Sequence, residues 1–399
     1  MRANLTKFND RSRKNVSLHD NSHLLLNFFE MKKLVFICLV VALFSCTEHK
    51  MNVWYKGNTH THSTYSDGDT DVRDVIKWYH DNDYHFLFVT DHNCPLNPDS
   101  IKLDFSMRSD FILIPGNEVT DVQVIHTSAL QTTTSIPTIS DYSRKLRNGE
   151  ISEAEFQALP NTRAGILDMH VKHILVAGGL PVINHPNFVS GVQVADILPV
   201  KELKHLELFN GHPSVYNFGN ELHSAVEIKW DSLLIQGKLL YGIACDDEHQ
   251  LKKTGREFAN PGRGWIMVNA VSLSAKDIMN AIKSGDFYSS TGVFLEEYSV
   301  ENNVIKVAID QKATLDELNA GRGYPRNDLK DVTPGFNIEF IGYNGKIIKT
   351  ENSLKAQYKI QPDDQYVRVR ITYNIDHQGH FDTYYAWAQP VEGEKGFFK

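Results

Sequence analysis

The sequence predicts an α/β domain over residues 53–293 and a small antiparallel β domain over residues 294–399. In the first part, apolar runs such as HFLFVTDH, FILIPGNE and LPVINHP alternate with helix-period segments. Short runs rich in Val, Ile, Leu and Phe are typical of strands buried on both faces. Repeated strand and helix units predict a parallel α/β architecture. After residue 293 polar and apolar residues alternate, which is typical of antiparallel strands.

Two segments of the first part have the spacing and ends of amphipathic helices. Over residues 70–83, apolar residues stand at i, i+3, i+4 and i+7: Val72, Val75, Ile76 and Tyr79. This spacing predicts a helix with one apolar face. A second helix is predicted over residues 274–285, which begin with a serine suited to the N-cap and end with a glycine suited to the C-cap.

Residues 131–163 break the alternation with threonines, serines, asparagines and charged residues. We interpret them as an insertion on one face, partly helical near ISEAEFQAL. Such a segment is either a surface excursion or a lid over a pocket.

The C-terminal part contains one strong turn signal and one ambiguous strand. Asn344-Gly345 predicts a two-residue hairpin turn. Arg368 and Arg370 alternate with Val367, Val369 and Ile371, which predicts a solvated strand face. A carbohydrate or partner site on that face is the alternative.

The N-terminal 52 residues have the features of targeting and linker segments and not of a folded domain. Residues 31–46 contain a methionine, two lysines, an apolar run and Cys46, which is the layout of a secretory signal. The run is shorter than the ~20 residues that span a bilayer, and its end resembles a bacterial lipobox. We therefore predict an exported protein, lipid-anchored through Cys46 at the cell envelope, on the periplasmic face or the outer membrane. Residues 1–30 are interpreted as a non-native upstream extension and residues 47–52 as a linker.

Composition and charge narrow the class of partner. The chain has 41% hydrophobic and 23% charged residues, which is ordinary for a globular protein. Its net charge of −8, from 41 basic and 49 acidic residues, provides no basic surface for nucleic acid. We expect a small-molecule substrate and no nucleic-acid partner.

Histidine and carboxylate residues gather where the predicted strands end. Parallel α/β barrels carry their active sites at the C-terminal ends of the strands. The residues at or near those ends are Asp91, His92, Glu118, His126, His185, Asp247 and His249. Burying so many ionisable groups costs several kcal/mol each unless something pairs with them, and multivalent cations supply that pairing.

The stretch GNTHTHSTYSDG adds an H-x-H pair. In an extended segment His60 and His62 point to the same side, so they could share one ion, although a polar stretch of this kind could also cap a helix. Nitrogen and oxygen ligands without a useful thiolate suit Zn²⁺, Mn²⁺ or Fe²⁺. No Walker loop, G-x-S-x-G elbow or C-x-x-C pair is present, which leaves metal-dependent hydrolysis as the predicted chemistry.

Five of these motifs, taken in order, resemble those of one family. HTHSTYSDG, TDHN, GNE, INHP and DDEH resemble the motifs of the PHP (polymerase and histidinol phosphatase) superfamily. The segments YKGNTHTHSTYSDG and WYHDNDYHFLFVTDHN resemble most closely its stand-alone secreted branch, which includes carbaryl hydrolases. The resemblance implies a distorted seven-stranded β/α (TIM-like) barrel over residues 53–293, followed here by a small antiparallel β-sandwich-like domain.

The resemblance also implies two or three divalent metal ions, Zn, Mn or Fe, and a ligand set. The first ion would be held by His60, His62, Glu118 and Asp247, the second by Glu118, His126 and His185, and the third by Asp67, His92 and His249. Glu118 would then bridge two ions. The link from His126 to His185 is longer than in compact members of the superfamily.

The predicted mechanism is attack by a metal-bridged hydroxide, because divalent ions lower the pKa of bound water towards about 7. Besides Glu118 and Asp247, the candidate catalytic residues are Arg256 and Arg263 in TGREFANPGRGW. Either guanidinium would offset charge on the leaving and equatorial oxygens of a phosphate ester.

Three neighbouring acids and two strand-end residues complete the candidates. Asp246, Asp247 and Glu248 offer three carboxylates where one is needed, and Asp247 is preferred because Asp-x-His spacing then matches the motif. Glu207 and Asn210, near the end of HLELFN, are expected to orient substrate or imidazoles, although Glu207 could equally be a solvated strand-end charge.

The main hypothesis is therefore a metal-dependent phosphoesterase. Hydrolysis of a carbamate, carboxylic ester or amide would use the same ions on a planar centre. A non-catalytic binding lipoprotein is the third hypothesis, and the intact ligand set argues against it.

Overall fold

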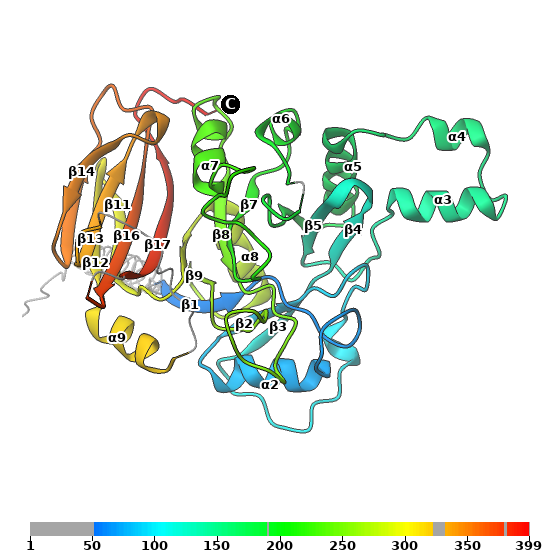
Figure 1. Ribbon diagram of the computed structural model, residues 1–399, viewed down its shortest axis with the longest axis horizontal. Helices are drawn as coiled ribbons and strands as arrows, with labels where there is room; N and C mark the ends of the chain where they lie inside the picture. The colour runs from blue at the N-terminus through cyan, green and yellow to red at the C-terminus, as the bar shows by residue number, and fades with distance from the viewer. Residues whose placement is uncertain (1–51, 190, 322–331, 379–380, 399) are drawn as a thin grey trace, which may run out of the picture. The chain divides into compact units, whose positions relative to one another are not determined.

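The computed structural model describes residues 52–189, 191–321, 332–378 and 381–398 (Figure 1). The predicted upstream extension, signal, lipid site at Cys46 and nearly all of the linker lie outside these residues. Within the described part, no helix combines the length and apolarity needed to cross a membrane.

The first three strands pair in parallel as predicted. They are β1 (Val53–Asn58), β2 (Phe86–Val89) and β3 (Ile112–Pro115). Helix α2 (Val72–Asp81) buries its four predicted apolar residues, which confirms the helix. Gly57 lies where the Phe86 ring crosses β1, and a Cβ there would meet that ring at 2.1 Å. Only glycine allows this close approach.

A second sheet has the order β4-β5-β6-β7-β8. Its strands are β4 (Glu118–Asp121), β5 (Ile125–Leu130), β6 (Leu180–Ile183), β7 (His205–Asn210) and β8 (Tyr241–Cys245). β6, β7 and β8 are parallel, but β4–β5 and β5–β6 are antiparallel. The prediction of a parallel architecture is therefore correct only in part. The turn η2 (Val122–Val124) between β4 and β5 is too short for a parallel crossover.

The two sheets share one apolar core and meet at their polar ends. Buried side chains of β2, β3, β5, β6, β8, β9 (Trp265–Ala270) and α8 (Ala275–Ser284) form a common cluster. Isolated parallel bridges join Thr61 to Glu248 and His92 to Glu118. Both bridges lie just beyond strand ends, where the predicted site residues are. The predicted helix over residues 274–285 is confirmed by α8.

The insertion is more helical than expected. α4 (Glu153–Gln157) confirms the helix predicted near ISEAEFQAL, and α3 (Ile139–Arg147) adds a second. Each helix begins with a capping box, which Thr138 forms in α3 and Ser152 forms in α4. The pair extends away from β4 and β5 (Figure 1). The remaining helices are α5 (Arg163–Val176), α6 (Val194–Ile197), α7 (Val226–Leu234) and α9 (Gln311–Asn319), with 3₁₀ turns η1 (Pro98–Ser100) and η3 (Tyr343–Gly345).

The C-terminal strands form antiparallel sheets, as predicted. They are β10 (Phe287–Ser290), β11 (Leu295–Glu301), β12 (Val304–Ile309), β13 (Gly335–Ile341), β14 (Ile347–Glu351), β15 (Lys355–Lys359), β16 (Tyr366–Asp376) and β17 (Phe381–Glu392). One sheet has the order β11-β12-β15, and its apolar residues pack with those of β13, β16 and β17. The hairpin at Asn344-Gly345 is confirmed, since both residues have positive φ, 63° and 67°, between β13 and β14, but its loop spans residues 342–346 and includes the turn η3, so the two-residue turn is wrong.

One sheet runs across the expected domain boundary at residue 293. Its order is β14-β13-β16-β17-β10-β9-β1-β2-β3, so strands of both parts are neighbours in it. β17 pairs with β10 on one side and with β16 on the other. The division into residues 53–293 and 294–399 stays a prediction.

The solvated face predicted for β16 is wrong at Arg368. Its side chain is 2% exposed and donates two hydrogen bonds to Asp231, at 2.8 and 2.7 Å, and one to Glu227, at 2.7 Å. The guanidinium also lies 5.0 Å from the centre of the Trp230 ring. Arg370 donates to Glu339 and Glu227. The arginines therefore attach β16 to helix α7.

Candidate metal centre

The H-x-H pair stands directly after β1, with both imidazoles fully buried. His60 Nε2 and His62 Nε2 lie 3.0 Å apart. Each lies 3.2 Å from Asp247 Oδ1 and 3.4 Å from Glu118 Oε2. Ligand atoms bound tetrahedrally at about 2.0–2.1 Å stand roughly 3.3 Å from one another. The spacing of these four atoms therefore fits a divalent ion.

The outer nitrogens of both rings have hydrogen-bond partners. His60 Nδ1 lies 2.6 Å from Glu207 Oε1, and His62 Nδ1 lies 3.2 Å from Ser66 Oγ. A ring that donates through Nδ1 presents a lone pair at Nε2. Two such lone pairs 3.0 Å apart repel each other unless a cation or a shared proton lies between them. The same contacts identify Glu207 as a buried partner of His60 and exclude the solvated alternative.

Glu118 is the centre of a second group. Its Oε1 atom lies 3.2 Å from His126 Nδ1 and 3.1 Å from His185 Nε2, and it accepts a 2.8 Å hydrogen bond from Asn184. Its Oε2 atom is buried and has no hydrogen-bond partner among the described residues, although His92 Nδ1 is 2.7 Å away. The structure thus brings together the three residues predicted for the second ion.

A third group surrounds Asp67, whose carboxylate is half-exposed. Its oxygens lie 3.4 Å from His62 Nδ1, His92 Nε2 and His249 Nε2. Asp67, His92 and His249 are the three residues predicted for the third ion, and His62 joins them. The donor atoms of these four residues are close enough to one another to hold an ion.

The carboxylates of this cluster stay ionised. Burial raises the pKa of Glu118, but His60 and His126 outweigh it and hold that pKa well below its usual range. Burial acts on Asp247 in the same way, and His60 and His62 lower its pKa well below the usual range. In the metal-free chain, burial lowers the pKa of His92, but hydrogen bonds with Asp67 and Glu118 raise it to about 10. The cluster therefore holds ionised carboxylates beside imidazoles with raised pKa values, and a bound cation would take the place of the protons on those rings.

The choice of Asp247 over its two neighbours agrees with the contacts. Asp246 accepts hydrogen bonds from Asn58, from the Tyr79 hydroxyl and from backbone amides. Glu248 accepts from Thr61, and burial raises its pKa well above the usual range. Of the three acids, only Asp247 has a carboxylate oxygen within 4 Å of a ring nitrogen of both His60 and His62 among the described contacts.

Hydrogen bonds hold the cluster in place, and two of its residues have a strained backbone. Asn210 Nδ2 donates to Glu207 at 2.9 Å and to Asp247 at 3.0 Å, and Glu207 accepts from the backbone amide of His185 at 2.6 Å. His185 and Asp247 both have positive φ, 26° and 51°. Such backbones cost about 1–3 kcal/mol and concentrate at functional sites. The orienting role predicted for Glu207 and Asn210 agrees with these contacts.

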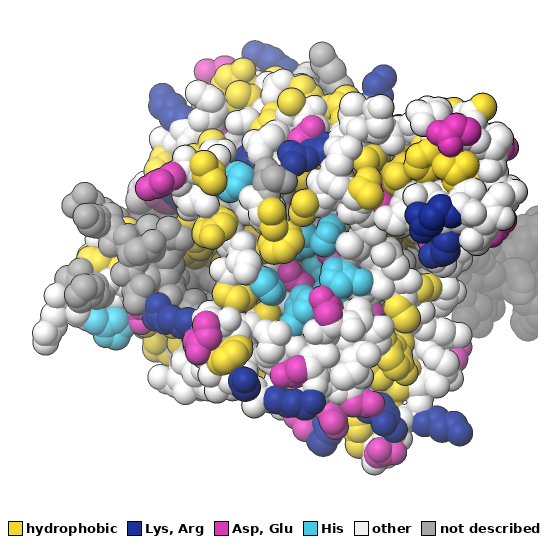
Figure 2. Space-filling view, turned by 45° about the vertical axis from the view of Figure 1, so that its right-hand side comes forward, with side chains coloured by type: hydrophobic (Ala, Val, Ile, Leu, Met, Phe, Trp, Pro, Cys, Tyr) yellow, Lys and Arg dark blue, Asp and Glu magenta, His cyan; other side chains and the backbone are white. Residues whose placement is uncertain are grey.

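A cavity of about 170 Å³ opens onto the cluster. Figure 2 shows histidine and acidic side chains gathered in the middle of one face, beside hydrophobic side chains, with lysines and arginines farther out. The lining includes two residues that the sequence analysis missed, Phe188 and His212. The Phe188 ring lies 5.1 Å from that of His185, and His212 lies 5.3 Å from His249. Both closely follow strands, so the strand-end argument extended by a few residues would have found them.

Neither predicted arginine lines this cavity. Arg263 is buried and donates to the carbonyls of Gly211 and Gly255 at 2.9 and 2.7 Å, which joins two loops. Arg256 is exposed. The residues of the insertion over 131–163 do not line the cavity either.

No protein-family model matches the chain, and no curated protein matches it. Among the solved structures that are similar to it, three share 14%, 16% and 17% of their residues with this chain. A two-domain protein from Bacteroides vulgatus, named for a PHP-like metal-dependent phosphoesterase, is 14% identical, with 84% of this chain and 95% of that chain covered and a TM-score of 0.40.

The second, named as a metal-dependent phosphoesterase from Bifidobacterium adolescentis, is 16% identical, with 50% of this chain and 89% of that chain covered and a TM-score of 0.31. The third, an amidohydrolase from Chromobacterium violaceum with bound sulfate and no metal, is 17% identical, with 48% and 87% covered and a TM-score of 0.30.

Proposed function

We propose that this chain is a metal-dependent hydrolase of phosphate esters with a PHP-type site. The observation that carries the proposal is the cluster of His60 Nε2, His62 Nε2, Asp247 Oδ1 and Glu118 Oε2, spaced 3.0–3.4 Å in the measured pairs. The order of the five sequence motifs supports the same assignment.

Two or three divalent ions would be held by the three groups of donor atoms. The proposed ligands are His60, His62, Glu118 and Asp247 for the first, Glu118, His126 and His185 for the second, and Asp67, His92 and His249 for the third. Their nitrogen and oxygen donors suit Zn²⁺, Mn²⁺ or Fe²⁺. When bound, such ions act as Lewis acids and lower the pKa of coordinated water.

The protein's own side chains orient the ligands and shape the cavity. Glu207 accepts from His60 Nδ1 and so directs the Nε2 lone pair to the centre. Asn184 and Asn210 donate to Glu118 and Asp247 and hold both carboxylates in place. Phe188 provides an apolar wall beside the ligands, which limits the access of water to the substrate.

We further propose that the strands close into the distorted seven-stranded barrel implied by the motifs. The bridges Thr61 to Glu248 and His92 to Glu118 support closure at both junctions between the sheets. β3 and β4, separated by two residues, would count as one strand.

Hydrolysis of a carbamate, carboxylic ester or amide is the second candidate. No lysine or arginine belongs to the described lining of the cavity, and a doubly charged phosphate monoester is best held by such groups. The motif resemblance to the branch with carbaryl hydrolases also favours this candidate. The complete ligand cluster argues against a non-catalytic binding protein.

Metal content and turnover of model esters test the proposal together. We expect two or three ions per purified chain, and turnover of p-nitrophenyl phosphate or bis-p-nitrophenyl phosphate. Removal of the ions with a chelator should abolish turnover, and added Zn²⁺ or Mn²⁺ should restore it. Turnover of p-nitrophenyl acetate alone would favour the second candidate. A chain that binds no metal would contradict both.

We also propose export and lipid anchoring through Cys46, based on the signal-like residues 31–46. Cells expressing the full chain should incorporate radiolabelled palmitate into it, and Cys46→Ala should remove the label. Labelling that survives this substitution would contradict the anchor.

A further inference from the structure

A second polar cavity lies far from the histidines in sequence, on the sheet formed by β13, β14, β16 and β17 (Figure 1). Its volume is about 320 Å³. The strand register places its residues on one face, because Asn337 pairs with Thr372, Glu339 with Arg370, and Asn374 with Thr383. The opposite face of these strands packs into the apolar core.

Uncharged hydrogen-bonding groups dominate this lining. Hydroxyls come from four threonines and amides from two asparagines: Thr333, Thr350, Thr372, Thr383, Asn337 and Asn374. The two charged side chains in the lining, Arg370 and Glu339, neutralise each other's charge. Arg370 donates to Glu339 at 2.7 Å and also to Glu227 at 3.1 Å. The cavity therefore offers neutral polar groups rather than a charge for an ion.

Two polar atoms of this lining are buried without a partner. Asn374 and Thr383 are 4% and 3% exposed, and the Oδ1 and Oγ1 atoms of these residues make no hydrogen bond to the part of the chain that is described. The amide nitrogen of Asn374 is already used, since it donates to the Thr333 carbonyl at 2.7 Å. Buried polar atoms are nearly always hydrogen-bonded, and an orphan one is costly. A ligand with hydroxyl groups would satisfy both.

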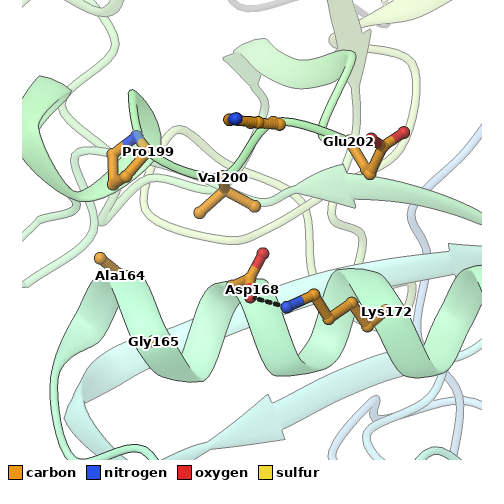
Figure 3. Close-up of a pocket in the computed structure, with 8 residues that line it drawn as sticks. Ala164, Gly165, Asp168, Lys172, Pro199, Val200 and Glu202 are labelled. Atoms are coloured by element: carbon orange, nitrogen blue, oxygen red, sulfur yellow. Dashed lines mark ion pairs between the residues drawn. The ribbon is translucent and has the colours of Figure 1, made fainter.

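Another cavity, between α5 and residues 199–202, provides a contrast (Figure 3). Its Asp168 and Lys172 pair with each other at 2.5 Å. None of the side chains that line it has a buried polar atom without a partner. It therefore has no group that requires a ligand.

We propose that the cavity on β13, β16 and β17 binds a neutral polyhydroxylated molecule, of the size of a mono- or disaccharide. Each sugar hydroxyl both donates and accepts, which suits Thr383 Oγ1 and Asn374 Oδ1. The neighbouring Tyr385 and Val332 supply apolar surface for the carbon-bound face of a sugar ring. The site is independent of the metal centre, so its existence does not rest on the proposed hydrolysis.

Saturation-transfer NMR on the full chain with glucose, galactose, mannose, N-acetylglucosamine and maltose tests the proposal. We expect at least one of these sugars to bind saturably with a Kd on the order of 1 mM. Thr383→Val keeps the shape and removes the orphan hydroxyl, so it should weaken that binding about tenfold without lowering thermal stability. Thr372→Val is a second variant in the same lining, with the same expected direction.

Two controls locate the binding. Thr134→Val, at an exposed threonine of the insertion, should leave sugar binding unchanged. His60→Ala should also leave it unchanged, although it should abolish hydrolysis. Absence of saturable binding by all five sugars, unaltered binding in both pocket variants, or loss of binding in His60→Ala would overturn the proposal.

Discussion

His60→Ala should lower hydrolysis about a thousandfold or more and reduce the number of bound ions. His60 Nε2 lies within 3.4 Å of three other donor atoms, so its loss opens the first ion's site. A Lewis-acid ion contributes several kcal/mol to transition-state stabilisation, and about 1.4 kcal/mol corresponds to a factor of ten in rate. Turnover and metal content should be measured on the same preparation.

Two variants make this result specific. His80→Ala removes a histidine that pairs with Asp81 on α2, outside the cavity, and should leave turnover and metal content unchanged. Glu207→Gln removes the charge behind His60 without removing a ligand, so we expect an intermediate loss of about 10–100-fold in metal affinity or activity. Full activity in His60→Ala with its metal content intact would remove the proposed site.

Arg368→Met should lower the free energy of unfolding by about 3–5 kcal/mol, the range for breaking a buried ion pair. The substitution keeps an apolar stem over Trp230 but leaves the carboxylates of Glu227 and Asp231 without their main partner. Both carboxylates lie mostly covered, with 17% and 14% of their side chains exposed. Urea unfolding monitored by circular dichroism would measure the loss.

A matched pair of variants separates charge from packing. Combining Arg368→Met with Glu227→Gln and Asp231→Asn removes the uncompensated charges, so much of the lost stability should return. Arg73→Met breaks the exposed pair with Asp71 and should leave the free energy of unfolding nearly unchanged, because surface ion pairs contribute little. If Arg368→Met were as mild as Arg73→Met, the arginine would not be what attaches β16 to α7.

The local elements could be predicted because they depend on local spacing. Helix α2 follows from four apolar residues on one face, and the hairpin from Asn344-Gly345. Strand direction was predicted less well. The apolar residues of β5 look like those of β6 and β7, and only the short turn between β4 and β5 rules out a parallel pair.

The site was predictable where strand ends bring residues together. Seven of the nine residues chosen from motifs and strand ends line one cavity, and the other two, His60 and His62, lie buried against Glu118 and Asp247. The arginines were chosen only for being close in sequence, and Arg263 instead donates to two loop carbonyls. Phe188 and His212 stand in the loops after β6 and β7, a few residues past the strand ends that the apolar pattern marks.

Arg368 illustrates a third limit. Alternation along β16 correctly separates its two faces, but it does not reveal what covers the outer one. Helix α7 is about 140 residues away in sequence, as the separation of 137 between Arg368 and Asp231 indicates. Tertiary packing turned a predicted solvent-exposed strand face into a buried ion pair.

The place of β17 in the nine-stranded sheet has a consequence for biosynthesis. This strand lies between β10 and β16, so the hydrogen bonds on both sides of it form only after residues 381–392 have left the ribosome. Until then β10 and β16 present unpaired edges, which can pair with other chains. Folding of this sheet therefore waits for residues 381–392, and a nascent chain that stalls before residue 381 exposes two strand edges suited to aggregation.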